Sequence, residues 1–181
     1  MRLKMLITTA LEALPVGYGG TDTGRETPMS AEALFDSGKA YLKKGDFDRA
    51  IADYTEALRI KPDYHEALNN RGLAYAGKGY LDRAIVDYTE ALRIKPDLPE
   101  ALNNRGNAYR RKGDFDRAIA DYTEALRIKP DYYKALCNRG LAYRYKGDIE
   151  HAIADWTEAL RIKPDDYETL YNRGIAYTMR Y

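Results

Sequence analysis

Apolar residues recur along most of this chain with the spacing of an amphipathic helix. Between residues 82 and 95, apolar side chains fall at i, i+1, i+4, i+7 and i+8: Ala84, Ile85, Tyr88, Ala91 and Leu92. Pro96 disfavours helix in the residue before it, so we expect this helix to end near Lys95. An earlier segment, Glu66 to Lys78, is rich in helix-forming residues and is stopped by Gly79. The pattern therefore predicts two helices joined by a short turn.

The same pair of segments recurs without insertion or deletion. The string Arg-Ile-Lys-Pro-Asp begins every 34 residues, at Arg59, Arg93, Arg127 and Arg161. The string Asn-Arg-Gly recurs with the same spacing, at Asn70, Asn104, Asn138 and Asn172. We therefore divide the chain into residues 1–30, four full repeats (31–64, 65–98, 99–132 and 133–166) and a partial repeat, 167–181. A helix pair cannot bury both of its apolar faces alone, so neighbouring pairs must stack into a solenoid.

Acidic residues three positions apart mark the expected start of three of the first helices. The pairs are Asp63 with Glu66, Asp97 with Glu100, and Asp165 with Glu168. This spacing predicts capping boxes, in which the Asp accepts from a free backbone amide and the Glu reaches back.

Small and aromatic residues occupy fixed positions in every repeat. Glycine takes the small position of the first helix (Gly38, Gly72, Gly106, Gly140) and tyrosine follows three residues later (Tyr41, Tyr75, Tyr109, Tyr143). The second helix carries alanine (Ala50, Ala84, Ala118, Ala152), an aromatic residue (Tyr54, Tyr88, Tyr122, Trp156) and a second alanine (Ala57, Ala91, Ala125, Ala159). Proline closes each unit (Pro62, Pro96, Pro130, Pro164). This combination resembles the tetratricopeptide repeat (TPR) family. The resemblance implies an all-α, right-handed α-solenoid of tandem 34-residue helix-turn-helix repeats, with residues 167–181 as a capping helix.

One position departs from the family pattern. Where the family usually has leucine before the glycine of the first helix, this chain has arginine: Arg71, Arg105, Arg139 and Arg173, with Ser37 in the first repeat. Aspartate repeats with the same period in the second helix: Asp53, Asp87, Asp121 and Asp155. We predict a ladder of bidentate Arg–Asp pairs between helices. The alternative is that the arginines bind a ligand.

The resemblance also implies a binding surface, because first helices of this family line a concave groove. The family's groove positions and the groove's far edge fall here on Lys39, Asn69, Asn70, Asn103, Asn104, Asn107, Arg110, Lys134, Asn138, Arg144 and Asn172. An amide side chain both donates and accepts, so periodic asparagines suit the backbone of an extended peptide. This arrangement is similar to the asparagine ladder of protein O-glycosyltransferases. The alternative is a solvated polar surface. The two-carboxylate clamp of co-chaperone members is absent, since only Asn104 and Lys134 match its pattern.

Charge and composition exclude several classes of function. The chain has 29 Lys and Arg against 28 Asp and Glu, a net charge of +1. Nucleic-acid binding by counterion release normally needs a clear basic excess, so we expect no nucleic-acid partner. Of the 17 tyrosines, eight fall on repeat packing positions, so the high tyrosine count does not indicate base stacking. The composition is that of a globular protein without a membrane span.

No sequence motif indicates catalysis. With a single cysteine, Cys137, and two histidines, neither a disulfide framework nor a Cys/His metal site is expected. The segment from Gly72 to Gly79 nearly spells a phosphate-binding P-loop, but Gly79 stands where that motif needs a hydroxyl. We predict no enzyme activity, no catalytic residues, no metal and no cofactor.

The two ends fall outside the full repeats. Leu3, Leu6, Ile7, Ala10, Leu11 and Leu14 have helical spacing, and a glycine-rich linker follows Pro15. We favour a short docking helix and a cytoplasmic protein. The alternative is a weak signal peptide in residues 1–20, which would export the protein. At the other end, apolar residues of the partial repeat predict self-association or partner binding, and truncation of a longer array is an alternative.

These features predict a non-catalytic protein–protein interaction scaffold. Its partner would be an extended peptide or a helix in the concave groove, with asparagines holding backbone and Lys39, Arg110 and Arg144 favouring acidic side chains. One alternative is a structural scaffold that self-assembles through its repeat ends as a homo-oligomer. Another is an accessory that targets substrates to a separate modifying enzyme.

Overall fold

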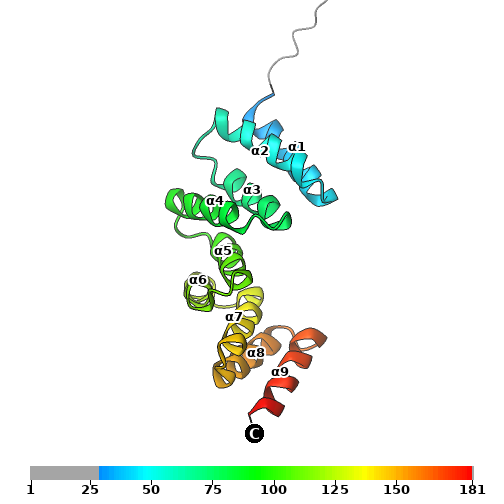
Figure 1. The fold of residues 1–181 in the computed structure, drawn as a ribbon, viewed down its shortest axis with the longest axis vertical. Helices are drawn as coiled ribbons and strands as arrows, with labels where there is room; N and C mark the ends of the chain where they lie inside the picture. The colour runs from blue at the N-terminus through cyan, green and yellow to red at the C-terminus, as the bar shows by residue number, and fades with distance from the viewer. Residues whose placement is uncertain (1–28, 181) are drawn as a thin grey trace, which may run out of the picture.

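The computed structural model describes residues 29–180, which form nine α-helices and no β-strand (Figure 1). The helices are α1 (Ala31–Lys44), α2 (Phe47–Ile60), α3 (His65–Gly77), α4 (Leu81–Ile94), α5 (Pro99–Arg111), α6 (Phe115–Ile128), α7 (Tyr133–Lys146), α8 (Ile149–Ile162) and α9 (Tyr167–Met179). The prediction of an all-α chain is confirmed. The helix and linker expected within residues 1–28 lie outside the described residues.

The helices stack in pairs along an elongated array that runs from α1 and α2 to α9 (Figure 1). Each first helix packs on the second helix of its own repeat, and each second helix packs on the next first helix. The first helices of successive repeats also touch one another: α1 with α3, α3 with α5, and α5 with α7. The first helices therefore lie on the inner side of a solenoid, as expected from the repeat pattern.

Glycine in the first helix allows the aromatic residue of the second helix to pack against its backbone. A Cβ atom on Gly106 would lie 2.7 Å from the ring of Tyr122, and one on Gly72 would lie 2.6 Å from Tyr88. Trp156 takes the same place over Gly140. The aromatic side chains are almost fully buried, so they cannot move aside to admit a larger residue. This contact explains most of the fixed glycine and aromatic positions.

The predicted capping boxes do not form. The N-caps of α3 and α5 are Tyr64 and Leu98, and neither makes a side-chain capping hydrogen bond. At α9 the capping residue is Asp166, which accepts from the amide of Thr169 at 3.0 Å. The helices begin one residue later than the boxes require, which leaves the preceding aspartates outside the first turn. The other side-chain caps are Ser30 at α1 and, on second helices, Asp46, Asp114 and Asp148.

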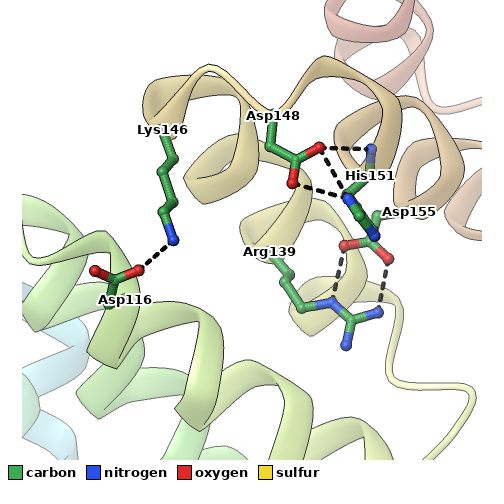
Figure 2. Close-up of polar contacts among 6 residues, drawn as sticks. All are labelled: Asp116, Arg139, Lys146, Asp148, His151 and Asp155. Carbon is green, nitrogen blue, oxygen red and sulfur yellow. Dashed lines mark hydrogen bonds and ion pairs between the residues drawn. The ribbon is translucent and has the colours of Figure 1, made fainter.

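The predicted Arg–Asp ladder is present within repeats two, three and four. Arg105 donates to both carboxylate oxygens of Asp121, at 2.8 and 2.7 Å. Its remaining terminal nitrogen donates to Thr89 of the preceding repeat at 3.1 Å. Arg71 with Asp87 repeats this geometry, and so does Arg139 with Asp155, the pair drawn in Figure 2. Each arginine therefore links the second helix of its own repeat to the second helix of the preceding repeat.

The ladder is incomplete at both ends of the described chain. In repeat one, Ser37 replaces the arginine, and Asp53 Oδ2 is buried without a hydrogen-bond partner among residues 29–180. In α9, Arg173 keeps the bond to Thr157 at 3.4 Å, but no carboxylate pairs with it in the described residues.

A second set of ion pairs links the ends of α3, α5 and α7 to the second helix that precedes each of them. These pairs are Lys78–Asp48, Lys112–Asp82 and Lys146–Asp116, the last of which is drawn in Figure 2.

Candidate functional site

Three hollows follow the first helices in a row. The hollow between α1, α3 and α5 has a volume of about 250 Å³ and is bordered by Lys39, Asn69 and Asn70. The next, between α3, α5 and α7, has about 380 Å³, and the third, between α5, α7 and α9, also has about 380 Å³. The second and third share Asn104, Asn107 and Asn138, so they are continuous. We call this row of hollows the groove.

The groove brings together nearly all of the site residues expected from the sequence. Those that line a hollow are Lys39, Asn69, Asn70, Asn103, Asn104, Asn107, Arg110, Lys134, Asn138 and Asn172. Arg144 lies beside them and donates to Asn172 Oδ1 at 3.3 Å.

The asparagines bond to one another, which the sequence-based prediction did not include. Asn104 Nδ2 donates to Asn69 Oδ1 at 3.1 Å, and Asn138 Nδ2 donates to Asn103 Oδ1 at 2.9 Å. In both cases an asparagine of one repeat is held by the asparagine 35 positions earlier. Asn103 is only 4% exposed, so its side chain supports Asn138 from behind. The repeat spacing itself contains this signal, since both partners recur in adjacent units.

These bonds leave hydrogen-bonding capacity that faces the groove. Each amide has two N–H donors and one carbonyl acceptor, and the pairing uses a single N–H of Asn104 or Asn138. The second N–H and the Oδ1 of each of these two side chains have no partner within the described part of the chain. Their orientation is fixed before any ligand arrives, which lowers the entropy cost of binding. Asn107 is different, because its Oδ1 accepts from the buried Tyr122 hydroxyl at 2.8 Å.

Acidic residues dominate one edge of the groove and basic residues the other, with Lys134 at the start of α7 as the exception on the acidic edge. Glu66, Glu100 and Glu168 border it at the start of the first helices. Arg110 borders it near the end of α5 and forms no ion pair with the described residues. Its Nε is buried without a hydrogen-bond partner there. This arrangement follows the helix macrodipole, which favours acidic residues at helix starts and basic residues at helix ends.

A cluster of hydroxyl and thiol groups closes the third hollow. Thr169 Oγ1 lies 3.0 Å from the Tyr133 hydroxyl and 3.2 Å from Cys137 Sγ. Burial raises the pKa of the Cys137 thiol, so it remains protonated and is a weak nucleophile. Hydrogen bonding from Thr169 lowers the pKa of Asp166 well below its usual range. Cys137 therefore lies in the groove wall, while Tyr133 and Thr169 were missed because neither is an asparagine or a charged residue.

Features that would indicate other chemistry lie elsewhere or are absent from residues 29–180. No group of His, Cys, Asp and Glu side chains there could hold a metal ion. His151 Nδ1 lies 2.8 Å from both carboxylate oxygens of Asp148, at the start of α8 (Figure 2). The segment that resembled a P-loop lies in α3 and the following turn. In the part of the chain described, no helix is long and apolar enough to cross a membrane.

These observations define a class of protein: a solenoid of helix-turn-helix repeats whose inner helices line a polar groove. A family model described as "TPR repeat" matches residues 38–79, 78–113 and 140–179, and one described as "Tetratricopeptide repeat" matches residues 99–132. The chain belongs to the tetratricopeptide repeat family, as its sequence pattern had suggested. A search of curated proteins finds no match.

Solved structures of similar proteins support this assignment. The chain is similar to the MamA protein, with 27% identity and a TM-score of 0.75 over 82% of this chain and 81% of that one. It is also similar to the first TPR of Spaghetti (RPAP3) bound to an HSP90 peptide, with 28% identity and a TM-score of 0.63 over 64% and 91%. A thermophilic TPR protein of Thermus thermophilus gives 25% identity and a TM-score of 0.71 over 84% of each chain.

Proposed function

We propose that this chain binds an extended peptide of a partner protein in its groove, without catalysis of its own. Tetratricopeptide repeats are scaffolds for protein–protein interaction. The observation that carries the proposal is the pair of asparagines, Asn104 and Asn138, held with unused donors and acceptors toward the groove. The related structure of the first TPR of Spaghetti holds an HSP90 peptide.

The spacing of the repeats suits an extended ligand. Packed helices lie about 8–10 Å apart, and three residues of a polyproline II segment advance about 9 Å. A peptide in this conformation presents the same backbone face at every third residue. Asn70, Asn104 and Asn138 would then each meet an equivalent peptide group, largely without regard to side chains.

Charge would supply the specificity. Lys39, Arg110, Lys134 and Arg144 favour acidic side chains in the ligand, and Arg110 has no competing carboxylate within the described chain. The clamp that grips a C-terminal tail is not reproduced, because only Asn104 and Lys134 match it. We therefore expect an internal acidic segment to bind rather than a free carboxyl terminus.

The test is capture of partners by crosslinking and mass spectrometry with groove variants. Changing Asn70, Asn104 and Asn138 together to Ala should abolish capture and leave the sedimentation coefficient unchanged. A matched triple variant, Arg59→Ala, Arg93→Ala and Arg127→Ala, removes exposed residues that, within the described chain, pair only with a glutamate of their own helix. That control should retain capture. Loss of capture in both variants, or altered assembly with capture intact in the asparagine variant, would contradict the proposal.

Two further parts of the sequence-based interpretation remain predictions. A cytoplasmic location is one, and the proposed signal-peptide alternative concerns residues outside the described part. A role as a substrate-targeting accessory is the other, since it would use the same groove to hold the substrate of a separate enzyme. Identifying the captured partner distinguishes this role from a simple scaffold.

A further inference from the structure

The outward face of α9 is built like the faces that receive a second helix elsewhere in the array. We define this face by Leu170, Arg173, Gly174 and Tyr177. Leu102, which corresponds to Leu170 in repeat three, is 5% exposed, whereas Leu170 is 44% exposed. A Cβ atom on Gly174 would meet nothing within 4 Å among the described residues. The α9 face therefore keeps the shape of a helix-binding surface but has no helix on it in the described structure.

The internal repeats show which chemistry this surface accepts. On α5, the covering helix α6 places Asp121 on Arg105 and the ring of Tyr122 on Gly106. Leu126 of the same helix joins Leu102 in one apolar cluster. The covering helices thus share an aspartate, an adjacent aromatic residue and an apolar residue one turn later. Three independent copies of this contact occur, on α3, α5 and α7.

We propose that the α9 face docks an amphipathic helix of a partner protein that carries an acidic residue directly followed by an aromatic residue. Arg173 selects the acid, because among residues 29–180 its guanidinium bonds to Thr157 alone. Gly174 selects the aromatic ring, because only there can a flat side chain reach the helix backbone. This site is separate from the groove and does not depend on the proposed groove function.

Charge argues against two other occupants. A second copy of α9 crossing this face would bring Arg173 close to its own symmetry mate, and the nearest acid of that helix, Glu168, lies more than a turn away. Residues 1–28 of this chain contain no acidic residue followed by an aromatic one. A helix that resembles α6 satisfies all of the contacts.

The experiment uses the full chain and a fluorescent peptide with the sequence of residues 114–129, which includes α6 and its cap. A hydrocarbon staple between positions 116 and 120, both exposed in the array, keeps the peptide helical. Fluorescence polarisation should show binding. The matched peptide with Asp121→Asn and Tyr122→Ala should not bind.

Two protein variants locate the site. Arg173→Ala should weaken binding about tenfold through loss of a charge-assisted contact. Gly174→Phe should abolish binding by filling the space for the ring, and since Gly174 is open, its unfolding midpoint should be no lower than that of the unchanged chain. Gly174→Phe should also leave partner capture by the groove unchanged, which separates this proposal from the previous one.

Three results would overturn the proposal. The first is peptide binding that neither variant reduces. The second is a homodimer in sedimentation that Gly174→Phe dissociates, which would make a second copy the occupant. The third is peptide binding that appears only after residues 1–28 are deleted, which would place that segment on the α9 face.

Discussion

The middle of the array and its ends carry closely similar residues in different surroundings. In repeat three, Arg105 bonds both Asp121 of its own repeat and Thr89 of the preceding one. At the start of the array the aspartate is kept as Asp53 but the arginine is not, and at the end the arginine is kept as Arg173 without an aspartate in the described chain. A residue's contribution here depends on its neighbouring repeats, so stability should be a sum of nearest-neighbour interfaces.

The largest effect on stability should come from breaking a complete Arg–Asp pair of the ladder. Arg105→Leu leaves the buried Asp121 carboxylate without its partner, which should cost about 3 kcal/mol in the free energy of unfolding. Arg173→Leu removes only the long bond to Thr157 and should change stability by less than about 0.5 kcal/mol. Urea denaturation monitored by circular dichroism measures both.

A double variant separates the ion pair from general disruption. Replacing both Arg105 and Asp121 with Leu removes the buried charges together, and much of the lost stability should return. If the double variant is no more stable than Arg105→Leu, or if Arg105→Leu and Arg173→Leu have equal effects, the contrast between middle and end is wrong.

The second comparison concerns Gly106 and Gly174, where substitution by alanine should change the free energy of unfolding in opposite directions. Gly106→Ala would place a methyl group 2.7 Å from the buried Tyr122 ring. Overpacking typically costs about 1–3 kcal/mol and the gain in helix propensity is about 1 kcal/mol, so we expect a net loss of up to about 2 kcal/mol. Gly174→Ala meets no atom of the described residues and should stabilise α9 by up to about 1 kcal/mol. Denaturation midpoints of the two variants should move in opposite directions.

Much of the fold could be predicted because the same packing pattern recurs in the sequence of every repeat. The spacing of glycine and aromatic residues indicates which helices touch, and the arginine and aspartate periods predicted a ladder that the structure confirms. The helix caps could not be predicted in the same way, because a capping box depends on the helix starting at one particular residue. Pro99 favours the first position of α5, and this start is one residue later than the expected box needs.

The groove, too, could be predicted from the sequence only in part. Its asparagines could be assigned from the repeat register, because first helices recur on the same side of a solenoid. The bonds of Asn104 to Asn69 and of Asn138 to Asn103 depend on side-chain rotamers, which periodicity does not specify. Thr169 closes the third hollow at a position where internal repeats have alanine, so its role arises only at α9.

Restoring the missing Arg–Asp pair in repeat one should stabilise the protein by a smaller amount. In Ser37→Arg, the guanidinium should reach Asp53, whose Oδ2 is buried without a partner in the described chain. Hydrogen bonds to charged groups contribute about 1.5–3 kcal/mol, and ordering an arginine costs up to about 2 kcal/mol, so a gain of about 1 kcal/mol is expected. Ser37→Lys is the matched control, because one ammonium cannot pair bidentately. Equal gains from the two variants would show that charge alone, and not the ladder geometry, matters.

The smallest effect concerns the helix caps of repeats two and three. Tyr80 stands at the N-cap of α4 without a capping bond, where α6 has Asp114, which accepts from the Arg117 amide at 3.2 Å. Tyr80→Asp should add a cap of about 1 kcal/mol. It also removes the contacts of the Tyr80 ring with Lys78 at 5.1 Å and with Arg83 at 5.5 Å, each worth about 0.5 kcal/mol at an exposed site. An aspartate here gains an ion pair with Arg83 like that of Asp114 with Arg117, worth about 0.5 kcal/mol, which leaves a net gain of about 0.5 kcal/mol. Tyr80→Ala loses the ring and gains no cap, so thermal unfolding should rank the aspartate variant first, the unchanged chain second and the alanine variant last. Any other order would mean that the tyrosine ring, rather than the missing cap, determines how α4 begins.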